Sequence, residues 1–215
     1  MQTPRDSLLE KPDSVRLTAK ELSPSTWPDF AELFEKHNGV WGGCWCMYYH
    51  DQGTFLLGNR IRANRNKERK QSLVAKARAH GIVVYSNGTP VGWCQFGARE
   101  ELPRLDANRS YLKLGLRDAK KRKLWRITCF FSDRDYRGVG VASFALKAAL
   151  SAIRKKGGGI VEAYPLQSLG AITRKTERGK ASFMWSGTVN MFKKAGFKII
   201  APLGKSRRLV RKIVN

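Results

Sequence analysis

Hydrophobic residues recur at helical spacing in several segments of the chain. Near the N-terminus, Phe30, Leu33 and Phe34 fall on one helical face. They follow a hydroxyl residue, a proline and an acid within 25–29, which together predict a helix start. Segment 138–156 has the clearest apolar face, which comprises Val141, Phe144, Ala145, Ala148, Ala149 and Ile153. Both segments therefore predict amphipathic helices with one buried face.

Two further helical segments are expected. Residues from about 56 to about 80 predict one or two basic helices that end at Gly81. The inner face of this region comprises Leu73, Val74 and Ala77. A short helix is expected over 188–195, where Gly196 stops it.

Short β-rich runs alternate with these helices. Asn87-Gly88 separates the runs 82–85 and 91–96 and predicts a tight hairpin. The other expected strands lie at 15–17, 125–131, 160–164, 197–201 and 208–214. The order of these elements predicts one mixed α/β domain over 14–215, after a flexible tail at 1–13.

A glycine-containing loop follows the most apolar strand. The sequence 125–147 reads W-R-I-T-C-F-F-S-D-R-D-Y-R-G-V-G-V-A-S-F-A-L-K, so the strand leads through the loop into a helix. Backbone N–H groups at such a helix start can converge on an anion, and Gly138 and Gly140 leave room for a pyrophosphate. The loop lacks the Lys-Ser/Thr of a P-loop and the third glycine of a dinucleotide fold. Taken alone, it also fits a tight strand-to-helix turn.

Two motifs resemble the GNAT superfamily of N-acetyltransferases. R-D-Y-R-G-V-G-V-A is similar to the pyrophosphate loop of that family, whose pattern is Arg/Gln-x-x-Gly-x-Gly/Ala. M-F-K-K-A-G-F, at 191–197, is similar to its final-helix signature, and the order of elements matches over 14–214. The resemblance implies a mixed, mostly antiparallel sheet of about seven strands, flanked by helices and split in a V shape between strands 4 and 5.

The resemblance also implies an N-acyltransferase. Acetyl-CoA or another acyl-CoA would be the co-substrate, and a small-molecule or peptide amine would attack its thioester directly. Backbone groups of Phe130, Phe131 and Ser132 would bind the pantetheine arm and polarise the thioester carbonyl. The residues implied to hold the pyrophosphate are Arg137, Gly138, Val139, Gly140 and Val141.

Two positions depart from the family pattern. Phe192 stands where many members have a tyrosine that protonates the leaving thiolate, and Trp185 stands where some have an asparagine. Tyr164 or Ser132 is then a candidate acid. Glu162 is a candidate base acting through water, with an exposed strand residue as the alternative interpretation.

The stretch 40–51, V-W-G-G-C-W-C-M-Y-Y-H-D, is rich in aromatic and sulfur-containing residues. Three potential metal ligands lie in this stretch, namely Cys44, Cys46 and His50, and His37 or Cys94 could be a fourth. Zinc sites usually have a second pair of ligands at a distance, and none is evident here, so we expect no metal. In the family layout the stretch lies where the acceptor enters, so we expect an acceptor pocket with aromatic stacking. Its residues would be Trp41, Cys44, Trp45, Cys46, Tyr48, Tyr49, His50 and Trp93. An ordinary packed loop is the alternative.

The charge balance is strongly basic. The chain has 41 Lys and Arg against 17 Asp and Glu, a formal net charge of +24. This indicates either a solvated basic surface or a polyanionic partner such as tRNA. The candidate nucleic-acid contacts are Arg60, Arg62, Arg65, Lys120, Lys121, Arg122, Lys123, Arg174, Lys175, Arg207 and Arg208.

The charge keeps three alternatives open besides a simple amine acceptor. Aminoacyl-tRNA could be the acyl donor, it could be the acceptor of an acetyl group, or the chain could bind RNA without catalysis. No apolar run is long enough for a membrane span and no signal pattern starts the chain, so we expect a cytoplasmic protein without a membrane partner. A monomer and a homodimer are both compatible with the sequence.

Overall fold

The computed structural model describes residues 16–50, 59–116, 123–167 and 184–215. The tail predicted over 1–13 lies outside these residues. Five of the basic candidates also lie outside them, namely Lys120, Lys121, Arg122, Arg174 and Lys175.

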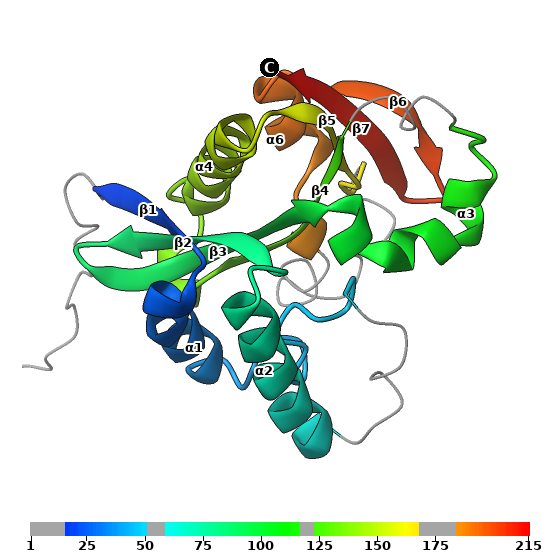
Figure 1. The fold of residues 1–215 in the computed structure, drawn as a ribbon. Coiled ribbons are helices and arrows are strands. Elements are labelled where there is room, and N and C mark those ends of the chain that lie inside the picture. Colours follow the sequence, from blue (N-terminus) through cyan, green and yellow to red (C-terminus); the bar gives the residue numbers. More distant parts are fainter. Residues whose placement is uncertain (1–15, 51–58, 117–122, 168–183) are drawn as a thin grey trace, which may run out of the picture.

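The predicted strands pair into one sheet at the centre of the described structure (Figure 1). It has seven strands in the order β1-β2-β3-β4-β5-β7-β6. They are β1 (Leu17–Glu21), β2 (His80–Ser86), β3 (Thr89–Ala98), β4 (Leu124–Ser132), β5 (Gly159–Ala163), β6 (Lys198–Leu203) and β7 (Arg207–Val214). The predicted hairpin joins β2 to β3, and Asn87 and Gly88 have φ values of 49° and 83°, as a type I′ turn requires.

The sheet splits beside β4. β4 and β5 are parallel, whereas the other neighbouring strands are antiparallel. Pairing of β4 with β5 ends at Ile127↔Ala163, but β4 continues to Ser132 and stays paired with β3 as far as Gly92↔Ser132. The last residues of β4 therefore keep one edge open toward β5. This confirms the predicted mixed sheet with a split between strands 4 and 5.

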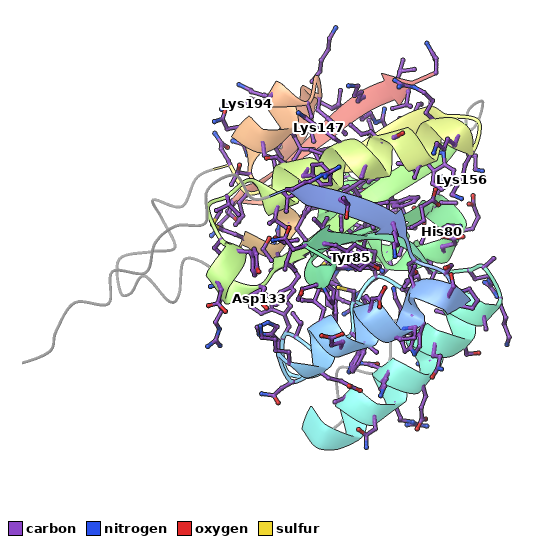
Figure 2. The ribbon with its side chains drawn as sticks, turned by 90° about the vertical axis from the view of Figure 1, so that its left-hand side faces the viewer. His80, Tyr85, Asp133, Lys147, Lys156 and Lys194 are labelled. Atoms are coloured by element: carbon purple, nitrogen blue, oxygen red, sulfur yellow. The ribbon has the colours of Figure 1, made fainter. Side chains whose placement is uncertain are left out.

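Helices cover both faces of the sheet. α1 (Trp27–Glu35) and α2 (Asn59–Ala75) lie on one face, and α4 (Val141–Lys155) and α6 (Val189–Lys194) on the other (Figures 1 and 2). The strand alternation shows the reason, because Val83 packs with the α1 side and Val84 with the α4 side. None of the described helices is long and apolar enough to cross a membrane.

The predicted apolar faces form the core. Phe30, Leu33 and Phe34 of α1 are buried. On α4 the buried positions are Val141, Ala145, Ala149 and Ile153, while Phe144 and Ala148 are partly buried against the same cluster. Asn108 caps the short helix α3 (Arg109–Leu112), which follows the 3₁₀ turns η3 (Arg99–Glu101) and η4 (Pro103–Ala107). These elements occupy the segment between β3 and β4, for which the sequence predicted neither a helix nor a strand.

The predicted end of the basic helical region is wrong. α2 ends at Ala75, and Ala77 is exposed with a φ of 52° instead of lying on the inner face. Gly81 lies inside β2, where a Cβ would collide with the ring of Trp93. This glycine therefore makes room for a tryptophan on the next strand and does not stop a helix.

The predicted start of the helix at Gly138 is also early. α4 begins at Val141, because Gly138 and Gly140 have φ values of 82° and 90° and belong to a left-handed loop. The 3₁₀ turn η6 (Arg134–Tyr136) precedes this loop. Strand β4, η6, the glycine loop and α4 thus follow one another at the open end of the sheet.

Candidate active site

Two neighbouring cavities in the described part of the chain concern the site, and the larger of them lies at the open end of β4. Its volume is about 1050 Å³, and its wall includes Phe130, Phe131 and Ser132 of β4. Arg137, Gly138, Gly140 and Val141 line it from the loop and the start of α4. The structure thus brings together all the predicted donor-binding residues except Val139, which does not line the cavity and is 45% exposed.

The glycine loop presents main chain to the larger cavity. An added Cβ at Gly138 or Gly140 would meet no atom within 4 Å, so the missing side chains leave open space. Gly140 is the N-cap of the 15-residue helix α4, whose dipole favours negative charge at this end. A pyrophosphate fits this arrangement of backbone amides and helix start.

The side chains around the larger cavity add positive charge. Arg134 and Arg137 line it, and its described lining residues include no Asp or Glu. Asp133 lies just behind the loop, where it accepts hydrogen bonds from Lys36 Nζ at 2.7 Å and from the backbone N–H of Asp135. Burial raises the pKa of Asp133, but the hydrogen bonds from Lys36, the Asp135 backbone and His37 together outweigh this and the pKa is lowered. The loop is thereby attached to the end of α1 (Figure 2 labels Asp133).

A smaller cavity of about 490 Å³ adjoins the first one. Its wall comprises Tyr48, Tyr49, Arg104, Leu105, Ala107, Asn108, Tyr164, Trp185, Leu203 and Arg207. Trp185 lines both cavities and so belongs to the wall that they share. These residues come from six separate parts of the chain, including the 3₁₀ turn η7 (Met184–Ser186) that carries Trp185.

The aromatic stretch divides between the cavities and the core. Trp41 lines the larger cavity, whereas Tyr48 and Tyr49 line the smaller one. The other predicted acceptor residues line neither cavity and are buried or nearly so; they are Cys44, Trp45, Cys46, His50 and Trp93. The four that belong to the stretch pack as its packed-loop alternative describes, and Trp93 packs from β3, so contact with these two cavities does not support an acceptor role for the five.

The backbone explains this division. Asn38 to Gly43 all have positive φ, between 51° and 80°, and form a left-handed turn in which the Cys44 N–H donates to Val40 O at 2.8 Å. Such a conformation is costly for Val40 and Trp41, which are not glycines. It leaves Trp41 40% exposed at the larger cavity.

A buried polar cluster lies behind the stretch. The amide nitrogen of Gln95 donates to Cys46 O at 2.8 Å and to His50 Nε2 at 2.9 Å, and Lys70 Nζ lies 3.1 Å from the same His50 nitrogen. Because Nε2 faces two donors, it accepts, and Nδ1 donates to Glu101 O at 2.8 Å. Burial lowers the pKa of His50 well below its usual value, so the ring is neutral.

Nothing in the sequence indicated that Lys70 is buried. It belongs to the basic run of α2, yet its side chain is fully buried against the Trp93 ring, with Nζ 5.5 Å from the centroid. Burial lowers the pKa of Lys70 to about 8. Cys46 and Cys129 lie beside it, with their sulfur atoms 3.2 Å apart. In the described part of the chain, no group of three or more His, Cys, Asp or Glu is placed to hold a metal ion.

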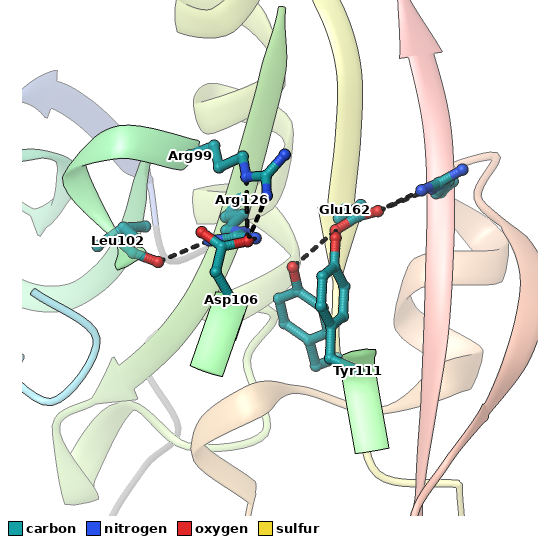
Figure 3. A network of polar contacts seen from close by, with 8 residues as sticks. Arg99, Leu102, Asp106, Tyr111, Arg126 and Glu162 are labelled. Carbon is teal, nitrogen blue, oxygen red and sulfur yellow. Dashed lines mark hydrogen bonds and ion pairs between the residues drawn. The ribbon is translucent and has the colours of Figure 1, made fainter. Parts of the chain in front are cut away.

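Glu162 is a structural carboxylate. It is fully buried and accepts hydrogen bonds at 2.8 Å from the hydroxyls of Tyr111 and Tyr164 and from Nε of Arg211 (Figure 3). It lines neither cavity. The geometry therefore supports neither the role of base nor the alternative of an exposed strand residue.

A second ion pair flanks Glu162 in the same layer. Arg126, fully buried, donates to Asp106 through Nη2 at 2.6 Å and Nη1 at 3.1 Å, and Nη1 also donates to Leu102 O at 2.7 Å (Figure 3). The Arg126–Asp106 pair attaches η4 to β4, the Tyr111–Glu162 hydrogen bond attaches α3 to β5, and the Glu162–Arg211 pair joins β5 to β7. They hold the wall of the smaller cavity and do not face its interior.

The two remaining catalytic candidates lie in different cavities. Ser132 lines the larger cavity, and Tyr164 lines the smaller one while its hydroxyl donates to Glu162. Burial raises the pKa of Tyr164 well above its usual value, which keeps the phenol protonated. Phe192 is fully buried against Phe130 and Phe197 and offers no proton.

The described basic candidates lie on several elements. Arg65 is exposed on α2, and Lys123 is exposed just before β4. Arg60 and Arg62 belong to α2, but their side chains are outside the described structure. Arg208 is half-buried and donates to Arg207 O at 2.9 Å, whereas Arg207 lines the smaller cavity. The prediction of a phosphate contact at Arg207 thus falls on a residue that faces a pocket.

Comparisons with known proteins agree with this geometry. The family model described as the acetyltransferase (GNAT) family matches residues 30–168. Similar solved structures include histone acetyltransferase HPA2 and related acetyltransferase from Corynebacterium glutamicum, with a TM-score of 0.53, 14% identity and coverage of 93% of this chain and 97% of that one. Another is the PaiA N-acetyltransferase from Thermoplasma acidophilum in complex with coenzyme A, with a TM-score of 0.50, 12% identity and coverage of 92% and 99%. At such identities these structures support the fold alone. No curated protein sequence matches the chain.

Proposed function

Because the chain belongs to the acetyltransferase (GNAT) family, we propose that it transfers an acyl group, most simply acetyl, from acyl-CoA to an amine. The observation that carries this proposal is the larger cavity. There a loop with two left-handed glycines meets the start of α4 beside the open edge of β4. A similar fold in the Thermoplasma acidophilum enzyme is found with coenzyme A, which supports the same donor here.

Different residues of the larger cavity would bind different parts of the acyl-CoA. Backbone amides of Arg137 to Val141 would hold the pyrophosphate, with the guanidiniums of Arg134 and Arg137 nearby. Within the described residues, the peptide groups of Phe130 to Ser132 on the open edge of β4 pair with no strand on the β5 side, and they suit the amides of a pantetheine arm. The acyl-CoA supplies an activated thioester, and the chain supplies position and polarisation.

The smaller cavity would receive the amine. Trp185 lines both cavities, so an amine at this wall lies next to the donor. The acyl carbon exchanges its bond to sulfur for a bond to the amine nitrogen, and the electron pair of the broken bond leaves with sulfur. One proton of the amine is lost and the released thiol gains one, so an amide and free CoA are the products.

Ser132 is the proposed donor of the proton to the sulfur. It lines the larger cavity at the end of β4, whereas Tyr164 lines the other cavity and its hydroxyl is occupied by Glu162. Since Phe192 cannot supply a proton, we assign the role to Ser132, whose hydroxyl is the one that β4 itself brings to the described wall.

A tRNA-engaging reaction is a second candidate because of the charge. The net charge of +24 favours a polyanionic partner, with aminoacyl-tRNA as donor or acceptor, or bound RNA without catalysis. The arrangement at the larger cavity supports acyl-CoA instead, because its backbone amides suit a small diphosphate better than a duplex.

Titration of the protein with acetyl-CoA and with bulk tRNA at several salt concentrations tests this choice. We expect micromolar acetyl-CoA affinity and, in a thiol-release assay with an amine panel, free CoA that appears only when an amine is present. Tight tRNA binding that falls steeply with salt, together with no acetyl-CoA binding, contradicts the proposal.

A further inference from the structure

The wall of the smaller cavity carries positively charged side chains that the proposed function does not explain. Arg207 lines it from the start of β7, and Arg104 lines it from η4. The described lining residues include no Asp or Glu. The rest of the wall is aromatic, aliphatic or amide. A cationic amine alone would find no charged partner on this part of the wall.

Arg207 is held in a fixed position. Its guanidinium carbon lies 4.3 Å from the ring centroid of Trp185, and its Nη1 donates to Tyr164 O at 3.0 Å. The side chain is half-buried and, within the described residues, has no ion pair with a carboxylate. Burial lowers the pKa of Arg207, and the groups that act against this are the phenols of Tyr49 and Tyr48.

The guanidinium of Arg207 is suited to bind an anion. Partial burial of a charge is costly unless a hydrogen-bonding counter-charge is present. One N–H of Arg207 is used by Tyr164 O, and the planar fork has five in all. Carboxylate and phosphate are the groups that match two parallel N–H donors of arginine.

The remaining walls suit an apolar body. The Tyr48 and Tyr49 rings meet edge to face at 4.9 Å, and the Trp185 ring lies 5.9 Å from Tyr49. Leu105 and Leu203 complete this surface. A volume of about 490 Å³ has room for a compact small molecule.

We infer that the acceptor is a small primary amine that carries a carboxylate or phosphate, with this oxyanion bound by Arg207. The apolar part of the acceptor packs against Tyr48, Tyr49 and Trp185. Because Arg207 stacks on Trp185, the wall shared with the larger cavity, the anchored acceptor lies beside the donor. This inference rests on the proposed function, since it names the acceptor of that reaction.

Matched pairs of amines test the inference. Phenylalanine and phenethylamine differ only in the carboxylate, and phosphoethanolamine and ethanolamine differ only in the phosphate. Calorimetric titration of the protein with each amine, without acetyl-CoA, measures the affinity of the smaller cavity for that amine. Thiol release in the presence of acetyl-CoA measures turnover. We expect the acid-bearing member of at least one pair to have a kcat/KM about 10-fold or more above its partner. The pair that shows the larger gap identifies the oxyanion.

Arg207→Gln removes the proposed anchor, and Lys205→Gln removes one charge from the exposed turn before β7 as the matched control. In Arg207→Gln we expect the KM of the acid-bearing amine to rise about 10-fold, with the KM of its acid-free partner and the acetyl-CoA Kd unchanged. Arg207→Lys keeps the positive charge but loses the planar guanidinium, so its KM for the acid-bearing amine should lie between the values of wild type and Arg207→Gln. Thermal melts of each variant check folding.

The outcomes separate the inference from the proposed function. Acid-free amines that bind and react as well as their acid-bearing partners overturn the inference, as does an equal effect of Arg207→Gln and Lys205→Gln. Absence of acetyl-CoA binding overturns the proposed function. In that case the calorimetric comparison of phenylalanine with phenethylamine still decides whether Arg207 forms an anion site.

Discussion

The two cavities are built from different parts of the polypeptide. The larger one presents main chain, at the glycine loop and at the open edge of β4, and its key residues fall within 130–141. The smaller one presents side chains, and six separate parts of the chain contribute to its wall. A site made of backbone binds a feature shared by many donors, whereas a site made of side chains selects one acceptor.

The two cavities should also respond differently to amino-acid substitutions. Substitution of a side chain around the larger cavity leaves its peptide groups in place, so binding there depends mainly on backbone conformation. The smaller cavity depends on tyrosine, tryptophan and arginine side chains and on the buried ion pairs behind them. We therefore expect substitutions to affect the two ligands separately.

Glu162→Gln has the largest expected effect. The substitution removes the buried charge that Arg211 Nη2 approaches at 2.7 Å and weakens two tyrosine hydrogen bonds. We expect the free energy of unfolding to fall by about 3 to 5 kcal/mol, measured by urea denaturation. For the protein that remains folded, the acetyl-CoA Kd should be unchanged.

A catalytic base at Glu162 predicts a different pattern. It requires wild-type stability in Glu162→Gln together with a large loss of kcat. That result would contradict the structural role assigned to this carboxylate and would also place it in contact with the smaller cavity.

Lys70→Met tests a buried charge that lines neither cavity. Burial lowers the pKa of Lys70 from 10.5 to about 8, so below pH 8 the folded state carries a desolvated ammonium while the unfolded state carries a hydrated one. Lys70 thus lowers the free energy of unfolding by about 3 kcal/mol at pH 7, and this loss fades as pH rises from about 8 to about 10.5.

We expect Lys70→Met to be more stable than wild type by up to about 3 kcal/mol at pH 7, with the difference shrinking by pH 10. Urea denaturation with reductant at several pH values measures this. His50, Cys46 and Cys129 face Lys70 and are retained in both proteins. An advantage that stays constant up to pH 10 would contradict the lowered pKa.

Ser132→Ala has the smallest expected effect and tests the side-chain chemistry of the larger cavity. We expect kcat to fall about 10- to 100-fold with an unchanged acetyl-CoA Kd, because the hydroxyl acts on the leaving sulfur and not on the pyrophosphate. Tyr164→Phe is the control, since it removes a hydroxyl from the smaller cavity and from Glu162. Equal kcat in Ser132→Ala and wild type would show that another group donates the proton.

The fold was predictable because its signals are local. The Asn87-Gly88 turn, the apolar faces of α1 and α4 and the two glycines of the loop each act over a few residues. The donor-binding residues followed from the resemblance of the loop to the GNAT family, and all of them except Val139 line the larger cavity. Even so, Gly81 was misinterpreted, because its partner Trp93 lies on another strand.

The smaller cavity and the buried ion pairs were not predictable in this way. Arg207 belongs to a basic run like several others, and only the fold places it against Trp185. Glu162 meets its partners from α3 and β7, and Lys70 is buried within a strongly basic helix. No spacing rule relates such residues, because their contacts arise from tertiary packing.

Two glycine substitutions test the central claim most directly. Gly138 and Gly157 have φ values of 82° and 93°, and an added Cβ at either would meet no atom within 4 Å. Valine therefore strains the backbone similarly at both, but only Gly138 lines the larger cavity. By calorimetry we predict that Gly138→Val weakens acetyl-CoA binding about 100-fold and that Gly157→Val binds like wild type. Wild-type affinity in Gly138→Val, or an equal loss in both variants, would contradict a donor site at this loop.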